Sequence, residues 1–247
     1  MTDLPTLLTC LLFLAIALLY ACAGQAGASG YIAVMALLGY APESIKPTAL
    51  ILNTLVSLVV SWRFVKDRHF DWPLFWPFAL GALPLALLGG YLTLPQQWFE
   101  YLLGVLLLIA GGLSFLRKPS AETQPQAPRR SVAYAWGALI GLMSGLTGVG
   151  GGVLITPLLL FFNWSGVRTA ASVSALFILL NSVVALIGHW SATSFYLPEG
   201  IGALAVMAVA GGLLGARLGS RVLTPSQIRL VLGVILIVAG LKMILSA

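Results

Sequence analysis

Long apolar segments dominate this chain of 247 residues and limit the folds that are open to it. Several segments run for about 20 residues, which is the length that an α-helix needs to cross roughly 30 Å of hydrocarbon. Hydrophobic residues make up 60% of the chain and charged residues only 8%, against roughly a quarter charged residues in soluble domains. Because lipid offers the backbone no hydrogen-bond partner, each spanning segment must be a helix. We therefore predict an all-α integral membrane protein that crosses the bilayer many times.

A polar stretch divides the apolar segments into two similar sets. Residues 117–131, RKPSAETQPQAPRRS, are rich in Pro, Gln and charge and cannot cross a membrane, so we interpret them as a linker. The pattern predicts a first membrane repeat at 1–116, a cytoplasmic linker at 117–131 and a second membrane repeat at 132–247. The apolar segments are Leu4–Gly39, Thr48–Val65, Trp72–Leu92 and Trp98–Leu116 before the linker, and Ala133–Trp164, Ala170–Trp190, Ile201–Ala216 and Gln227–Leu245 after it.

Three ordered matches between the two sets indicate an internal duplication. The segment from Asn53 to Trp62 matches the segment from Asn181 to Trp190 without a gap. Two further pairs match in the same order, 103–111 with 232–240 and 24–30 with 145–151. Chance similarity between leucine-rich helices is the alternative, but leucine content does not explain the matched Asn, Trp and Gly positions.

The distribution of Lys and Arg predicts that the two repeats have opposite orientations. These residues favour cytoplasmic loops, and they occur at 63–68 in the second connection of the first half but at 217–221 in the third connection of the second half. Both basic loops can lie on the cytoplasmic side of the membrane only if Leu4–Gly39 and Ala133–Trp164 each enter the membrane and leave it on the same side. We therefore predict two inverted repeats, each a broken-helix hairpin plus three transmembrane helices, with about 8–10 membrane segments in all.

Glycine clusters interrupt both predicted hairpins and form the candidate substrate site. Glycine permits positive φ, and a helix that begins after such a turn points free N–H groups and partial positive charge into the membrane, which suits an anion. Close helix packing is the alternative, and it is the simpler explanation for the glycine pairs at 89–90, 111–112 and 211–212. The predicted substrate-binding residues of the clusters are Gln25, Gly27, Ser29, Gly30, Ser144, Thr147, Gly148, Gly150, Gly151 and Gly152.

Two asparagines complete the predicted substrate site. Asn53 and Asn181 lie inside apolar segments, where an unpaired amide would cost roughly 1–3 kcal/mol. Each must therefore bond either to another helix or to the substrate.

The sequence indicates no catalytic residue, metal site or cofactor, because every acidic residue lies in a loop or at the end of an apolar segment. A net charge of +6 fits cytoplasmic loops better than a nucleic-acid partner. The expected partners are a small anion and the lipid bilayer, and a homo-oligomer is left open.

The glycine-rich motif of the second half resembles that of a known family. Residues 144–157, SGLTGVGGGVLITP, followed by residues 174–182, SALFILLNS, are similar to the TauE/SafE family of sulfite-exporter-type permeases. The first-half counterparts lie at 50–53, 62–64 and 83–90, so the resemblance covers nearly the whole chain. The first cluster, GQAGASG, is poorer in glycine than the second, so equal use of both clusters is not implied.

The resemblance implies a secondary transporter in the cell membrane, which in bacteria is the inner membrane. It implies an exporter of sulfite, a small organosulfonate or another sulfur-containing anion. Together with the broken helices it favours alternating access around a site near the bilayer midplane. A channel, or a permease for another small organic anion or a neutral solute, is the alternative. A membrane enzyme is disfavoured, because it would need clustered His, Asp, Glu or Cys side chains within the segments.

Overall fold

The computed structural model describes residues 4–66, 68–92, 95–116, 125–192, 196–222 and 224–246, and within these ranges it contains helices and no strand. The predicted all-α class is confirmed. The first half forms α1 (Leu4–Cys22), α2 (Ala28–Leu37), α3 (Pro42–Lys66), α4 (Trp72–Tyr91) and α5 (Gln96–Leu116). The second half forms α6 (Arg130–Thr147), α7 (Gly152–Phe161), α8 (Val167–Ala192), α9 (Ile201–Arg217), the short π-helix η1 (Leu218–Val222) and α10 (Pro225–Ser246).

Residues 117–124 of the predicted linker lie outside the described residues. At its other end, Arg130 and Ser131 already belong to α6.

Helix length separates spanning helices from half-length ones. Three of the described helices, α3, α4 and α8, are long and apolar enough to cross a membrane by length and composition. By contrast, α2 and α7 have 10 residues each, which is about 15 Å and half of the hydrocarbon thickness. Large apolar side chains such as Leu80, Val206 and Leu245 are exposed, as expected of a surface that contacts lipid tails.

Local signals mark several helix ends. α4 begins after Asp71, whose side chain accepts a hydrogen bond of 3.1 Å from the backbone N–H of Leu74. An aspartate in this position caps the helix, and the following Pro73 lies in the first turn, where a backbone donor has no intrahelical acceptor. Gly39 follows α2 with a φ of +72°, which is the usual conformation just after a helix end.

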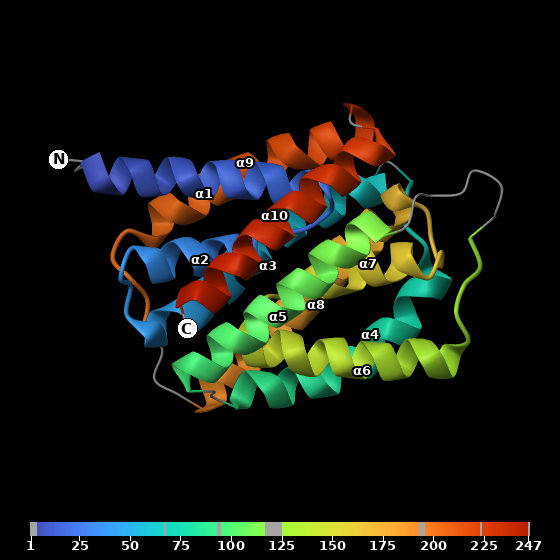
Figure 1. Ribbon diagram of the computed structural model, residues 1–247, viewed down its shortest axis with the longest axis horizontal. Helices are drawn as coiled ribbons and strands as arrows, with labels where there is room; N and C mark the ends of the chain where they lie inside the picture. Colours follow the sequence, from blue (N-terminus) through green and yellow to red (C-terminus); the bar gives the residue numbers. More distant parts are fainter. Residues whose placement is uncertain are drawn as a thin grey trace.

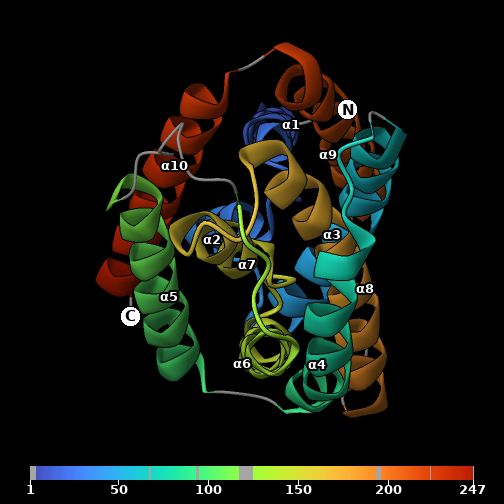
Figure 2. The same cartoon turned by 90° about the vertical axis from the view of Figure 1, so that its right-hand side faces the viewer.

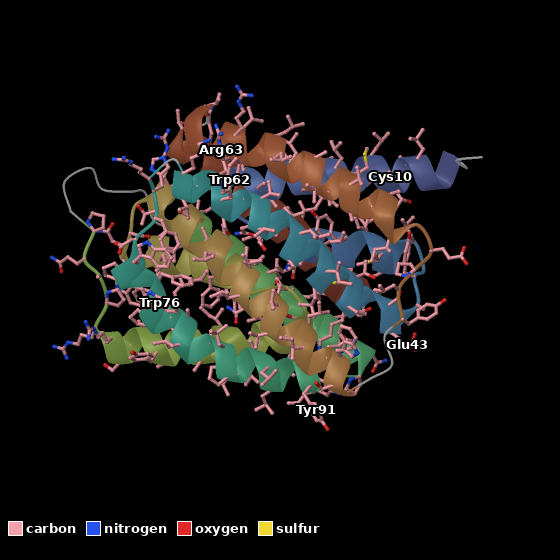
Figure 3. All side chains as sticks on the ribbon, turned by 180° about the vertical axis from the view of Figure 1, so that it is seen from behind. Cys10, Glu43, Trp62, Arg63, Trp76 and Tyr91 are labelled. Carbon is pink, nitrogen blue, oxygen red and sulfur yellow. The ribbon has the colours of Figure 1, made fainter. Side chains whose placement is uncertain are left out.

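The helices run along one axis, with α2 and α7 at the centre of the bundle. Figure 2 looks along this axis and shows α2 and α7 surrounded by the longer helices. α3 and α9 end, and α6 and α8 begin, at the same end of the molecule (Figure 1). Figure 3 shows Trp62 and Arg63 toward this end and Glu43 toward the opposite one. We call it the basic end, because its helix termini and the adjoining loop residues include Arg63, Lys66, Arg68, Arg129, Arg130, Arg168 and Arg217.

Helices of one half pack against helices of the other half. α1 packs against α9, α4 against α6, α3 against α8 and α5 against α10. The first two seams are very close, because a Cβ added at Gly215 would lie 2.1 Å from the Leu18 carbonyl oxygen and one at Gly141 would lie 2.2 Å from that of Ala82. The two halves are therefore interlocked rather than separate bodies.

The glycine pairs of the sequence analysis have the expected role with one exception. A side chain would collide with a neighbouring helix at Gly89, Gly90, Gly111, Gly211 and Gly212. Their predicted role in close packing is thereby confirmed. At Gly112 a Cβ would meet nothing within 4 Å, so packing does not require glycine there.

Buried side chains form two clusters that meet at α7. In the larger cluster the rings of Phe13 from α1 and Tyr31 from α2 stack with their centroids 4.9 Å apart. The smaller cluster is centred on Phe78 of α4 and Phe177 of α8. Leu154 of α7 packs against both clusters, so this half-length helix is held in place from two sides.

Candidate functional site

Each predicted hairpin is interrupted at its glycine cluster. Residues 23–27 separate α1 from α2 and residues 148–151 separate α6 from α7; we call these segments the first break and the second break. A Cβ disfavours positive φ, so glycine is the residue that permits both chain reversals. Positive φ angles from +74° to +97° occur at Gly24 and Gly27 in the first break and at Gly148, Gly150 and Gly151 in the second.

The backbone conformation of the two hairpins recurs with a constant offset. Positive φ at Gly148, Gly151 and Asn163 occurs 124 residues after positive φ at Gly24, Gly27 and Gly39. The sequence match of 24–30 with 145–151 is therefore three residues out of register with the structural correspondence. Gly145 lies within α6, where a Cβ would be 2.3 Å from the Ala86 carbonyl oxygen, so it serves packing rather than the turn.

The two half-length helices begin in the middle of the bundle and run toward opposite ends (Figure 1). The N-cap residues are Gly27 and Gly151, so neither helix has a side-chain cap. The first backbone amides of a helix have no acceptor within the helix, and they carry the positive end of its dipole. Both helices thus direct N–H donors into the protein interior, an arrangement that suits an anion.

Gly150 of the second break lies against two polar side chains from different helices. A Cβ at Gly150 would lie 2.6 Å from Asn53 Nδ2 of α3 and 2.7 Å from Ser182 Oγ of α8. Asn53 Nδ2 donates to the Val149 carbonyl oxygen at 3.0 Å. Both side chains are fully buried, and neither Asn53 Oδ1 nor Ser182 Oγ has a hydrogen-bond partner among the described residues. We call Gly150, Asn53 and Ser182 the Gly150 cradle.

A small cavity lies beside the second break, between this hairpin and α5. Its volume is about 10 Å³, close to what one water molecule needs. Ser144 Oγ has no partner within the described ranges, whereas Thr147 Oγ1 donates to the Met143 carbonyl oxygen at 2.7 Å. Ser144 is therefore the more available donor. The cavity is lined by Leu106, Leu107, Ser144, Thr147, Val149, Gly151, Val153 and Leu154.

A lysine that the sequence analysis did not select also lies at the second break. Lys46 Nζ donates to the backbone oxygens of Gly89, Gly90 and Leu92 at 3.2, 3.2 and 3.1 Å. These contacts use all three donors of the ammonium group and cap the C-terminus of α4. The stem of the same side chain borders the break, because a Cβ at Gly148 would lie 3.1 Å from Lys46 Cγ.

The start of α3 explains why Lys46 was missed. The apolar pattern predicts a start at Thr48, which leaves Lys46 in a loop. The structure begins α3 at Pro42, with Glu43 in the first turn. Proline and an acidic residue at these positions are recognised signals for a helix start, and they could have placed Lys46 inside the helix.

The first break is lined by an amide and two tyrosines. Gln25 is buried, and in the described structure neither its Nε2 nor its Oε1 has a hydrogen-bond partner. Ser29 Oγ and Tyr20 OH share a hydrogen bond of 2.8 Å. Tyr31 OH would lie 3.1 Å from a Cβ at Gly27. Sequence reasoning missed both tyrosines, because an aromatic residue in an apolar helix is ordinarily part of the core.

The structure brings together only part of the predicted substrate site. Asn53, Ser144, Thr147, Gly148, Gly150, Gly151 and Gly152 gather at the second break. Gln25, Gly27, Ser29 and Gly30 lie at the first break, where a Cβ at Gly30 would be 2.6 Å from Ile16.

Asn181 forms no hydrogen bond with either break within the described chain. Its Nδ2 donates to the Phe177 carbonyl oxygen of its own helix at 2.9 Å. Asn53 and Asn181 therefore have different bonding partners, although the sequence match treats them as equivalent.

The free polar groups of the second break are mainly donors. The uncapped amides of α7 and the hydroxyls of Ser144 and Ser182 can all donate, and Asn53 Oδ1 adds one acceptor. Nowhere in the described ranges do three His, Cys, Asp or Glu side chains gather as a metal ion would require. This arrangement can hold an anion through neutral donors.

Comparison with known proteins places the chain among membrane transporters. The sequence pattern of the sulfite exporter TauE/SafE family matches residues 9–243. The probable membrane transporter protein y4hK of Sinorhizobium fredii is 44% identical over 239 residues, which cover 94% of this chain and 95% of that protein. The probable membrane transporter protein YjnA of Bacillus subtilis is 23% identical over 90% of this chain and 92% of its own length.

A third relative comes from Methanocaldococcus jannaschii. The probable membrane transporter protein MJ0441 of Methanocaldococcus jannaschii is 24% identical over 83% of this chain and 81% of its own length. No solved structure matches the chain. The family match includes both breaks and extends from within α1 to within α10. The chain therefore belongs to the TauE/SafE sulfite exporter family and is a multi-pass transporter of the cell membrane rather than an enzyme.

Proposed function

We propose that this protein is a secondary transporter that exports a small oxyanion, namely sulfite or a small sulfonate. The Gly150 cradle at the uncapped start of α7 carries the proposal. There a free hydroxyl and a buried amide lie against the buried Gly150, two residues before the start of α7, whose first amides have no side-chain cap. Neutral donors of this kind can bind an anion without a fixed countercharge, so the anion can also leave.

The charges around the second break support a negatively charged substrate. The start of α7 carries roughly half a positive charge from its helix dipole. A buried hydroxyl without a partner costs about 1–3 kcal/mol, and an oxyanion bound at the cradle would satisfy Ser182. The family description adds sulfite as the specific oxyanion, whereas the donors support oxyanions in general.

We further infer that residues 1–116 and 132–247 are inverted repeats joined by a cytoplasmic linker at 117–131. If each helix of the first half corresponds to the helix in the same position of the second half, α1 corresponds to α6 and α4 to α9. The α1–α9 pair then corresponds to the α6–α4 pair, and the α3–α8 and α5–α10 pairs each join two corresponding helices. The opposite directions of α2 and α7 support the same symmetry (Figure 1). The basic end would then face the cytoplasm.

Alternating access in this protein must preserve the close seams between the halves. The contacts of Gly141 with Ala82 and of Gly215 with Leu18 hold α6 on α4 and α9 on α1. A motion that parted the first half from the second would open both seams. The moving bodies are therefore mixed, one containing α4 and α6 and the other α1 and α9.

Flux through liposomes that contain the purified protein tests the proposal. Radiolabelled sulfite should leave these liposomes faster than protein-free liposomes, and unlabelled sulfite outside should accelerate the exit if the protein is a carrier. Other small anions should compete, whereas a neutral solute such as glycerol should not. Flux at the protein-free rate from folded protein would refute sulfite transport. Rapid flux without acceleration by external sulfite would indicate a channel.

A further inference from the structure

We infer that the substrate of the Gly150 cradle carries an O–H donor of its own in addition to anionic oxygens. The inference rests on the proposed anion site and specifies its ligand class. That class is a small monoanion that retains one proton or hydroxyl group, such as hydrogensulfite or a hydroxyl-bearing sulfonate. Of the two protonation states of dissolved sulfite, this class includes hydrogensulfite and excludes the fully deprotonated dianion.

The orientation of the Asn53 amide follows from its backbone contact. The side chain lies 3.0 Å from the Val149 carbonyl oxygen, through Nδ2. A carbonyl oxygen accepts but cannot donate, so this contact requires Nδ2 and leaves Oδ1 as the remaining polar atom. Asn53 is 0% exposed and its Oδ1 has no hydrogen-bond partner among the residues that the structure describes. A buried acceptor of this kind is unfavourable until a donor reaches it.

Donor groups surround the position that a Cβ of Gly150 would occupy. The Cβ position of Gly150 is 2.6 Å from Asn53 Nδ2 and 2.7 Å from Ser182 Oγ. Oδ1 belongs to the same amide group as Nδ2, so the unpaired acceptor accompanies the donor that borders this position. The uncapped α7 begins at Gly152, two residues further along the chain. The cradle thus presents donors to a ligand together with Asn53 Oδ1, which can only accept.

A monoanion with one O–H group complements this set of partners. Its oxygens can accept from Ser182 and from the amides of α7, while its O–H can donate to Asn53 Oδ1. A dianion without a proton would place a negatively charged oxygen against Oδ1 and would double the charge that neutral donors must stabilise. Lys46 does not change this balance, because its three ammonium donors already bond to backbone oxygens.

Two sulfonates that differ in one group test the inference. Hydroxymethanesulfonate and ethanesulfonate have the same charge and nearly the same size, but only the first has an O–H group. We expect the purified protein to bind hydroxymethanesulfonate at least about tenfold more tightly in isothermal titration calorimetry. Sulfite should bind more weakly as the pH rises through the range in which hydrogensulfite loses its proton. The affinity for ethanesulfonate should stay constant over that range.

Variants assign the preference to one atom. Asn53→Leu removes Oδ1 and should bring the affinity ratio of the two sulfonates close to one. Thr54→Val is the matched control, because Thr54 Oγ1 bonds only to the Leu50 carbonyl oxygen of the same helix, at 2.8 Å, and its loss should leave the ratio unchanged. Thermal midpoints establish that both variants fold. If Asn53→Leu does not fold, the sulfonate pair and the pH series on the unmodified protein still decide.

The possible results separate the inference from the proposed function. Equal affinity of the unmodified protein for the two sulfonates, or tighter sulfite binding at high pH, overturns the inference and leaves the anion site in place. Failure of all three anions to bind at every pH removes the proposed function itself.

Discussion

Replacement of Gly150 by alanine perturbs the second break at the point where its polar groups converge. Gly150 has a φ of +77°, and a residue with a Cβ loses about 1–2 kcal/mol in this backbone region. The new methyl group would also lie 2.6 Å from Asn53 Nδ2 and 2.7 Å from Ser182 Oγ. Overpacking of this kind costs about 1–3 kcal/mol as the neighbours move aside. Together the two effects should lower the free energy of unfolding by about 2–5 kcal/mol.

Gly39→Ala separates the two effects. Gly39 has nearly the same backbone conformation, with a φ of +72°, but a Cβ there would meet nothing within 4 Å. This control should therefore lose only about 1–2 kcal/mol, from backbone strain alone. Thermal and chemical unfolding of the purified variants in detergent measures the difference between them.

Sulfite flux in liposomes then compares the variants at a temperature where both are folded. Gly39→Ala should transport at nearly the unmodified rate. Gly150→Ala should lose at least about tenfold in flux, because its methyl group occupies the point where Asn53 and Ser182 meet and weakens hydrogen bonds to the anion. Undiminished flux through folded Gly150→Ala would refute the cradle as the substrate site. An equal loss in Gly39→Ala would assign the effect to backbone strain.

Two further predictions concern the capping lysine and the orientation of the chain. Lys46→Met should lower the free energy of unfolding by about 2–3 kcal/mol, because the last carbonyls of α4 lose their charged donor. Thermal midpoints of this variant and of Glu43→Gln, an exposed control in the same helix, measure the loss. An unchanged midpoint in Lys46→Met would contradict the role of Lys46 as a cap of α4. Single cysteines at Arg68 and Arg217, introduced after replacement of the two native cysteines, should both react with an impermeant maleimide from the cytoplasmic side. Reaction from opposite sides of the membrane would be incompatible with inverted repeats.

Features set by local covalent structure and by the lipid environment could be predicted from the sequence. A run of about 20 apolar residues must form a helix in lipid, so the predicted segment Trp72–Leu92 is close to the observed α4, Trp72–Tyr91. The two breaks were also located correctly, because glycine clusters lower the cost of positive φ wherever they occur. The pattern did not show which glycine turns the chain, since Gly145 packs within α6 while Gly148 takes positive φ.

The partners of the polar side chains were decided by tertiary structure alone. Asn53 and Asn181 match in sequence, yet Asn53 of α3 bonds to Val149 of the second break while Asn181 bonds within its own helix. Lys46 obtains its role from carbonyl groups of α4 that lie more than about forty residues away in the chain. A hydrogen bond depends on which helix faces meet at a distance of about 3 Å. Hydropathy and glycine spacing specify the helices, but the interlocked packing of the two halves specifies which faces meet.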